Sequence, residues 1–346
     1  MTVDRFGLLA DGREVRRIVL GRPPGPVLHL LDLGATVHRL ELTCGDGVRR
    51  NVVLGHATPE HYLASGDYLG GTIGRYANRV AAGRFRLGGR EVRLGAHDRG
   101  NHLHGGPDGF DRRMWSLLDH DDLHAVLALH SPDGDQGFPG ALRAVVRFEV
   151  TDAGVRVWFE ATTDASTVVN LTSHAYFNLN GSGTVDEHAL QVFADSYTPV
   201  DASGIPLGGH APVAGTPFDF REAAVLGPAV RSGDEQIASA RGIDHNFVLR
   251  GRGPRPAAVL ESRQAGTRLE LRTDQPGLQV YTGNFFDGSS RSAEGRLYRQ
   301  GDGIALEPQL FPDSPNRPDF PSAVLEPGDV YRSTLEWAFT TVAPGG

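Results

Sequence analysis

The sequence predicts an all-β protein, a sandwich or a barrel, with few helices. Short runs of alternating apolar and polar residues, the pattern of half-buried strands, recur along the chain. Glycine (45 residues) and proline (22 residues) separate these runs, as expected for many turns. Long patterns with the period of amphipathic helices are nearly absent. Because no composition shift or low-complexity linker divides the chain, we expect a single domain over residues 1–346.

Individual elements follow from local signals. The apolar run Val27–Leu42 is interrupted by Gly34 and predicts two strands or one bent strand. The run 58–63 predicts a short helix, with a threonine cap and proline at the first helical position. Two hairpins are expected to turn at Gly88-Gly89 and at residues 151–154. Strands are expected at Phe85–Leu87, Arg90–Leu94, Ala144–Val150, Val155–Thr162, His188–Ala194, Arg268–Arg272, Leu278–Tyr281, Ile304–Leu306 and Tyr331–Phe339.

Composition excludes several classes of function. The net charge of −8 argues against a general affinity for nucleic acid or anionic membranes. All 34 basic residues are arginines, so Schiff-base chemistry and a P-loop lysine are excluded. A single cysteine, Cys44, cannot form an intrachain disulfide. Because the first residues carry charges and no apolar core of signal-peptide length, and no run approaches a membrane span, we expect a cytoplasmic protein.

The segment Val168–Gly181 is the most informative stretch for function. It begins like a strand and carries His174 and Tyr176 two residues apart. On an extended chain these two side chains point to the same face. A titratable ring beside an aromatic ring suits the wall of a pocket for a polar, ring-shaped ligand. The alternative is a core histidine packed next to a tyrosine.

Polar residues in four other segments are further candidates. Glu307 closes an apolar strand, where a carboxylate is costly unless it is paired or functional. Asn78 and Arg79 offer donors for an oxygen-rich ligand or lie on the surface. Asp244 could bind a ligand or only cap a turn. Gln279 shares one face of an expected strand with a tyrosine.

The histidines of NHLHGG (101–106) are spaced at i and i+2. His102 and His104 could hold a metal, but no third ligand is evident nearby in the sequence. The favoured interpretation is that one histidine faces a polar pocket and that the following glycines let a ligand approach. The predicted site therefore contains no metal.

Six segments together resemble the aldose 1-epimerase (galactose mutarotase) family. They are GGTIGRYANR (70–79), NHLHGG (101–106), NLTSHAYFNLNG (170–181), GIDHNF (242–247), LQVYTGN (278–284) and ALEPQ (305–309). The resemblance runs from Phe6-Gly7 to Tyr331 and therefore covers nearly the whole chain. It departs at Cys44, where the family often has asparagine, but no catalytic position is affected.

The resemblance implies a large antiparallel β-sandwich of the galactose mutarotase-like (supersandwich) type, without metal or cofactor. It also implies that His174 is the proton donor and Glu307 the proton acceptor. The residues that it implies for holding the sugar are Asn78, Arg79, His104, Tyr176, Asp244 and Gln279. The expected partner is a small monosaccharide, and the expected assembly is a monomer or homodimer.

The implied reaction interconverts the α and β anomers of an aldohexose such as galactose or glucose. A base removes the proton of the C1 hydroxyl while an acid protonates the ring oxygen, so the ring opens. After rotation about C1–C2 the roles reverse and the other anomer closes. We expect the acid and the base on opposite sides of the sugar ring, and a histidine with a carboxylate meets the requirement near neutral pH.

Three other interpretations stay open at the level of sequence. The first is a sugar-binding module without catalysis. The second is a hexose-6-phosphate 1-epimerase, which requires extra arginines at the pocket rim, with Arg75 and Arg99 as candidates. The third and least favoured is a glycosidase that uses Glu307 with Asp244.

Overall fold

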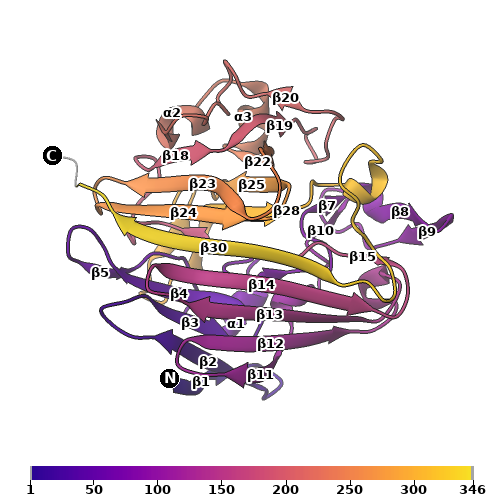
Figure 1. Ribbon diagram of the computed structural model, residues 1–346, viewed down its shortest axis with the longest axis horizontal. Helices are drawn as coiled ribbons and strands as arrows, with labels where there is room; N and C mark the ends of the chain where they lie inside the picture. The colour runs from indigo at the N-terminus through magenta and orange to yellow at the C-terminus, as the bar shows by residue number, and fades with distance from the viewer. Residues whose placement is uncertain (1, 344–346) are drawn as a thin grey trace.

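The computed structural model describes residues 2–343 and consists mainly of antiparallel strands (Figure 1). The prediction of an all-β antiparallel sandwich with few short helices is confirmed. The predicted single domain of residues 1–346 stays a prediction, and Met1 and residues 344–346 lie outside the described residues. Within the described residues, no helix has both the length and the apolar character needed to cross a membrane.

The largest sheet has nine strands and includes both predicted hairpin partners at 144–150 and 155–162. In spatial order its strands are β11 (Ser116–His120), β12 (His124–Ser131), β13 (Leu142–Val150), β14 (Gly154–Thr163), β30 (Tyr331–Thr341), β24 (Thr267–Thr273), β23 (Arg255–Ser262), β18 (Ala189–Val192) and β21 (Ala224–Val225). Figure 1 shows the long strand β30 running through the middle of this sheet, between β14 and β24.

Two further sheets contribute to the same core. The five-stranded sheet contains β1 (Thr2–Leu8), β2 (Glu14–Gly21), β3 (Val27–Leu31), β4 (Thr36–Thr43) and β5 (Arg49–Asn51). The six-stranded sheet contains, in spatial order, β17 (Tyr176–Phe177), β28 (Ile304–Gln309), β25 (Gly277–Tyr281), β22 (Asp244–Leu249), β19 (Ala194–Thr198) and β20 (Ala211–Pro212).

The remaining elements are short. Strand pairs are β6 (Thr72–Ile73) with β16 (Thr172–Ser173), β7 (Arg79–Val80) with β10 (His102–Leu103), β8 (Arg84–Leu87) with β9 (Arg90–Arg93), β15 (Thr167–Val168) with β29 (Val324–Leu325), and β26 (Asp287–Arg291) with β27 (Leu297–Arg299). The α-helices are α1 (Pro59–Ala64), α2 (Leu226–Val230) and α3 (Glu235–Ala240), and the 3₁₀ turns are η1 (Ala81–Gly83), η2 (Phe110–Arg112), η3 (Asp135–Gly137) and η4 (Ser314–Asn316).

Most local predictions are confirmed. Thr58 caps α1 and accepts a hydrogen bond from the backbone N–H of His61, and proline occupies the start of the helix. The chain turns at Gly34, so the apolar run 27–42 forms two strands, β3 and β4. The predicted strand His188–Ala194 is confirmed only over Ala189–Val192 (β18). It is wrong as one continuous strand, because the chain leaves the nine-stranded sheet at Val192 and enters the six-stranded sheet two residues later. Residues on both sides of this switch are buried, so the apolar pattern continues without a break.

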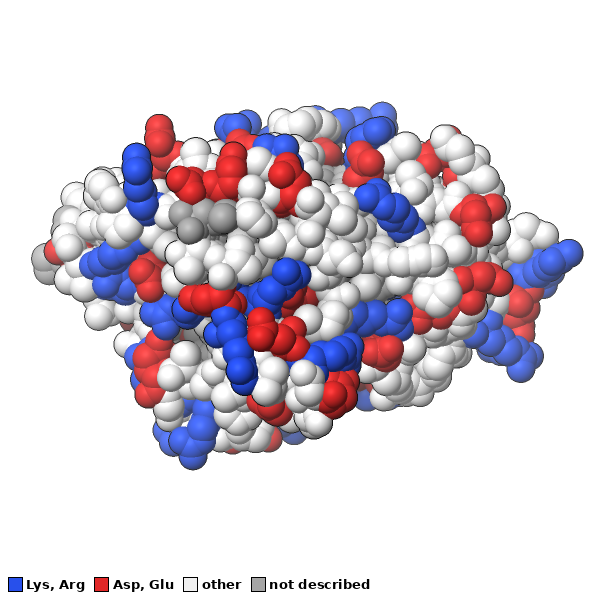
Figure 2. Space-filling view, turned by 90° about the horizontal axis from the view of Figure 1, so that it is seen from below, with Lys and Arg blue, Asp and Glu red and all other residues white. Residues whose placement is uncertain are grey.

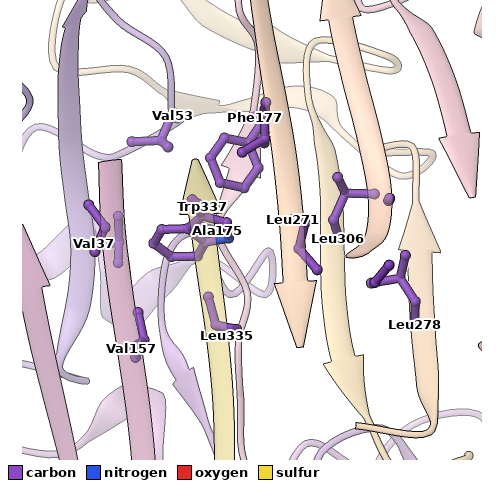
Figure 3. Packing of buried hydrophobic residues seen from close by; sticks show 14 of the residues in the cluster. Val37, Val53, Val157, Ala175, Phe177, Leu271, Leu278, Leu306, Leu335 and Trp337 are labelled. Atoms are coloured by element: carbon purple, nitrogen blue, oxygen red, sulfur yellow. The ribbon is translucent and has the colours of Figure 1, made fainter. Parts of the chain in front are cut away.

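The core fills the space between the nine-stranded sheet and the other two sheets (Figure 3). β13 alternates strictly, with every second side chain buried in this core. Trp337 of β30 is 1% exposed, and its ring centroid lies 5.3 Å from that of Phe177 of β17. This contact joins the nine-stranded sheet to the strand that carries Tyr176, and so it ties the core to the candidate site.

The six-stranded sheet has one face in the core and one face toward the candidate site. Along β28, Ile304 and Leu306 belong to the core, while the alternate residues Ala305 and Glu307 point to the other face. All six residues of β28 are buried, so both faces of this strand are covered. On the outer surface, arginine and acidic side chains are interspersed over the face shown in Figure 2, which gives no extended patch of one sign.

Candidate active site

One cavity of about 390 Å³ opens beside the six-stranded sheet, within the size range of small-molecule sites. All eight residues predicted from the sequence line it: Asn78, Arg79, His104, His174, Tyr176, Asp244, Gln279 and Glu307. Most of them are deeply buried, whereas Gly66, Arg99 and Phe285 are exposed and form part of the rim. The structure therefore brings segments separated by more than 200 residues to one place.

The strand registers explain this convergence. Tyr176 of β17 pairs with Ala305 of β28, and Glu307 of β28 pairs with Gln279 of β25. One strand further, Tyr281 of β25 pairs with Asp244 of β22. Directly opposed residues share a face in an antiparallel sheet, so Gln279 and Glu307 stand together. Since sheets are rigid, the backbone positions of these groups are fixed before any ligand arrives.

Glu307 and His174 form the most unusual pair in the cavity. Oε1 of Glu307 lies 3.6 Å from Nε2 of His174, and the two residues are 1% and 3% exposed. Neither Oε2 of Glu307 nor Nδ1 of His174 has a hydrogen-bond partner among the described residues. β28 also continues through Pro308 to Gln309, so Glu307 does not end its strand as the sequence suggested. Its carboxylate is buried without the usual compensation.

Burial shifts the pKa values of both Glu307 and His174. Loss of solvation raises the pKa of Glu307 well above its usual value, and the charge of Asp244 raises it further while Arg79 opposes the change. Burial also lowers the pKa of His174 to about 4. Each charged form is thus disfavoured by burial, and the two groups lie close enough to titrate as a pair. An acid and a base in contact in a cleft are typical of proton-transfer sites.

Arg79 is held in place by Asp98, which sequence reasoning missed. Nε of Arg79 donates to Oδ2 of Asp98 at 2.9 Å, and Nη1 lies 4.0 Å from Oδ2 of Asp244. A Cβ on Gly204 would lie 2.9 Å from Cζ of Arg79, so this glycine packs directly on the guanidinium. Because Nε is bound to Asp98, the two terminal nitrogens of Arg79 remain to donate to a ligand. Their fork-shaped arrangement suits oxygen-rich groups.

Asp98 begins a tight turn closed at Asn101 by two backbone hydrogen bonds of 2.9 and 2.7 Å. The signal for this turn was present in the sequence as the Asp-Arg-Gly-Asn run. No local pattern connects this turn to Arg79. Asp244 is held by a different contact: Nε2 of Gln279 donates to its Oδ1 at 2.7 Å. This hydrogen bond fixes the carboxylate of Asp244 as a further acceptor for a ligand in the cavity.

The two histidines of the 101–106 segment have different surroundings. His104 lines the cavity in a left-handed backbone conformation (φ +51°), whereas His102 packs against Phe138 and lies 2.8 Å from a backbone carbonyl through Nδ1. The expectation that one of them faces a polar pocket is thus confirmed. The expectation about the glycines is wrong: a Cβ on Gly105 would lie 1.8 Å from the carbonyl oxygen of Gly74, and neither glycine lines the cavity. Gly105 is required because two backbones pack closely there, whereas a Cβ on Gly106 would meet the side chain of Gln136 at 2.4 Å.

His104, His174 and Glu307 place ligand atoms within 4.8 Å of one another, a spacing that could hold a metal ion. The hydrogen bonding of His104 fits a metal poorly. The backbone N–H of Asn78 donates to Nδ1 of His104 at 3.1 Å, so Nδ1 must be the acceptor. The proton of the neutral ring is therefore on Nε2, the nitrogen that remains to face a ligand. His104 is fixed as a hydrogen-bond donor for the cavity.

Comparisons with known proteins place the whole chain in one family. The sequence model of the family "Aldose 1-epimerase" matches residues 16–338. The aldose 1-epimerase of Escherichia coli K12 is 42% identical over 339 residues, covering 96% of this chain and 97% of that one.

The chain belongs to the aldose 1-epimerase family.

Two further relatives support this assignment. The human galactose mutarotase is 39% identical and covers 98% of this chain and 94% of its own. The crystal structure of the galactose 1-epimerase from Lactobacillus acidophilus superimposes with a TM-score of 0.87 at 34% identity, over 99% of this chain and 98% of that one. This member of the aldose 1-epimerase family is thus an isomerase that acts on carbohydrates.

Other cavity residues were not predicted from the sequence. They include Asp67, Tyr68, Asp98, Tyr281 and Phe285. Tyr281 shares a strand face with Gln279, and this alternation is the signal in the sequence that could identify it. The others come from turns, where sequence periodicity gives no direction for a side chain.

Asp98→Ala should weaken sugar binding more than it slows the chemical step. Without its acceptor, Arg79 loses a charge-assisted hydrogen bond worth roughly 1.5–3 kcal/mol, so we expect KM to rise about tenfold while kcat changes less than about threefold. Steady-state kinetics measure both constants. Asp108→Ala, an exposed acid paired with Arg113 outside the cavity, is the matched control. An unchanged KM would show that Asp98 does not orient Arg79.

Glu307→Gln should stabilise the fold above pH 5. Because burial raises the pKa of Glu307, the folded state favours the protonated acid, and wild-type stability falls as pH rises above the usual glutamate value of about 4.5. The neutral amide avoids this loss. We expect a gain of more than about 1 kcal/mol at pH 8, where wild-type Glu307 must take up a proton on folding, and little gain at pH 4, where this carboxyl is largely protonated in both states. Denaturant titrations at both pH values test this, and equal gains would contradict it.

Proposed function

We propose that the protein interconverts the α and β anomers of aldohexoses such as galactose and glucose, with His174 as proton donor and Glu307 as proton acceptor. The observation that carries this proposal is the 3.6 Å contact of the two groups inside a cavity lined by sugar-compatible donors and acceptors. Family membership supports the reaction class. The proposal includes the cytoplasm as the place of action, as expected from the sequence.

The geometry changes one expectation about the mechanism. A separation of 3.6 Å leaves no room for a sugar ring between the acid and the base, so they cannot stand on opposite sides of it. Glu307 and His174 are instead close enough together to exchange protons with the two oxygens attached to C1, which are the hydroxyl oxygen and the ring oxygen. We infer that both groups approach the same edge of the sugar.

One proton shared by the pair is sufficient for the cycle. Burial favours the uncharged pair, in which the shared proton is on Glu307. In the form in which this proton has moved to His174, the carboxylate of Glu307 accepts the proton of the C1 hydroxyl while His174 gives its proton to the ring oxygen, and the ring opens. When the ring closes on the other carbonyl face, the same transfers run in reverse. Arg79, Asp244, Gln279 and the Nε2–H of His104 hold the remaining hydroxyls, so rotation about C1–C2 occurs within a fixed frame.

The alternatives receive less support. For a hexose 6-phosphate, Arg75 cannot serve, because it is 1% exposed and donates to backbone carbonyls including Pro139 and Gly140. Arg99 is at the rim but lies 3.6 Å from Asp98. Among the residues that line the cavity, the acids Asp67, Asp98, Asp244 and Glu307 outnumber the arginines Arg79 and Arg99, which disfavours a phosphate. A non-catalytic module would have no need for a buried acid and base in contact.

Polarimetry on freshly dissolved α-D-galactose and α-D-glucose tests the activity directly. We expect the purified protein to accelerate the approach to the equilibrium rotation in proportion to its concentration. A rate equal to that of buffer on every aldohexose would refute the proposal. Saturable sugar binding without acceleration would instead indicate a binding module.

His174→Asn and Glu307→Gln should each lower kcat by about 10²–10⁴-fold, because each removes one proton-transfer group. The fold should persist, since both substitutions preserve approximate shape. His130→Asn and Glu160→Gln change exposed residues of the same types and serve as controls. A full rate in either active-site variant would exclude the assigned role of that residue.

The pH dependence of kcat/KM should be bell-shaped. At low pH the pair takes up a second proton and loses its base, and because burial lowers the pKa of His174 to about 4, the acid limb should lie below 6.5. At high pH the last proton leaves, and because the pKa of Glu307 is raised, the alkaline limb should lie well above 4.5. An acid limb at pH 6.5 or higher would contradict this description of the pair.

A further inference from the structure

Tyr68 starts a turn that holds the backbone of His174. The N–H of Gly71 donates to the carbonyl of Tyr68 at 3.1 Å, closing the turn. The same turn binds both backbone groups of His174: the N–H of Gly70 donates to its carbonyl at 3.0 Å, and its N–H donates to the carbonyl of Gly71 at 2.9 Å. A Cβ on Gly70 would lie 2.1 Å from the carbonyl oxygen of Val37, so this turn is packed closely against the five-stranded sheet.

Tyr68 has a left-handed backbone conformation, with φ of +56°. This region is unfavourable for a bulky side chain and persists only where the surroundings enforce it. Nine described residues other than glycine have positive φ, and four of them line the catalytic cavity: Tyr68, Asn78, Arg99 and His104. Unfavourable conformations are thus concentrated at the site, where they direct side chains to particular positions.

The ring of Tyr68 packs on both histidines of the cavity. Its centroid lies 5.7 Å from the ring of His174, with planes inclined by 30°, and 4.6 Å from the ring of His104. Tyr176 lies 4.9 Å from the ring of His174, and Tyr281 lies 6.5 Å away. The imidazole of the proposed proton donor is therefore surrounded by aromatic rings on several sides.

This surrounding matters because hydrogen bonding does not orient His174 in the usual way. A catalytic histidine is commonly held by a carboxylate or carbonyl that accepts from its second ring nitrogen. Nδ1 of His174 has no such partner from another described residue. With no partner from another residue, the direction of the imidazole toward Glu307 depends on its own backbone and on packing by the neighbouring rings. A rotation about its side-chain bonds would break the 3.6 Å contact.

We propose that Tyr68 is a positioning residue, whose ring is the fixed wall that aims the imidazole of His174 at Glu307 and keeps water from it. This inference rests on the proposed function of His174. It assigns a role to the turn of residues 68–71, which begins two residues before the GGTIGRYANR segment. Tyr68 acts through His174, so its removal should affect the chemical step more than sugar binding.

Two variants distinguish the effect of the Tyr68 ring from the effect of its left-handed backbone conformation. Tyr68→Asn removes the ring but places a residue that tolerates the left-handed region, so the turn should be retained. We expect kcat to fall at least about tenfold and KM to change less than about threefold, because misplacing a proton donor reduces the rate steeply. Tyr68→Phe keeps the ring and should restore kcat to within about twofold of wild type. Gln136→Asn, at another left-handed position (φ +49°) that does not line the cavity, is the control.

A second readout does not depend on activity. The groups that face His174 are Glu307, Asp244, His104, Tyr68, Tyr176 and Tyr281. In Tyr68→Asn water reaches the imidazole, so the pKa of His174 should rise from about 4 toward 6.5, while Tyr68→Phe should leave it low. Nuclear magnetic resonance titration of the His174 ring in the sugar-free protein measures this shift.

The two readouts distinguish the possible failures. A kcat within twofold of wild type in Tyr68→Asn, or an unchanged titration of His174, would overturn the role of Tyr68. A wild-type protein that does not accelerate mutarotation would refute the proposed function instead, and the titration would still decide whether Tyr68 shields His174. A loss of kcat in Tyr68→Phe equal to that in Tyr68→Asn would show that the hydroxyl and not the ring is required.

Discussion

The structure depends on one unfavourable arrangement: a carboxyl group and an imidazole buried together without enough hydrogen-bond partners. Glu307 and His174 are almost fully enclosed, and each has an atom that no described residue satisfies. A sequence selected only for stability would replace such groups with apolar ones. The large core between the sheets, with contacts such as that of Trp337 with Phe177, stabilises the fold sufficiently to tolerate them.

The two faces of the six-stranded sheet have different roles, and this difference allows the polar groups of the site to be buried without disrupting the core. On β25 and β28 the residues Leu278 and Leu306 belong to the core, while Gln279 and Glu307 face the cavity. Because strand periodicity alternates, packing on one face fixes the position of polar groups on the other. Turns supply the remaining groups, and their left-handed residues direct side chains that strands cannot place. The site thus combines rigid strands with conformationally restricted turns.

Local elements of the fold could be predicted from the sequence more completely than the residues of the site. Alternation, capping residues and glycine turns predicted β13, β14, α1 and the hairpin at Gly88-Gly89, because these signals are local. The apolar run around Phe193 predicted one continuous strand, but the chain changes sheets there. Because the strands on both sides are buried, the hydrophobic pattern does not show where one strand ends and the next begins. Asp98 and Tyr68 were missed for a related reason: the direction of a side chain in a turn depends on contacts with segments far away in the sequence.

By itself the sequence determined the all-β class, the absence of lysine chemistry and the ordered motifs that hold the eight site residues. These follow from residue identity and from periods of two residues, which act over a few positions. Only the tertiary structure decided that Glu307 and His174 stand side by side, that Nδ1 of His104 accepts a backbone hydrogen bond, and that the ring of Tyr68 lies against the imidazole of His174. Such facts depend on distances of a few ångströms between chain segments that pack together only in the folded protein.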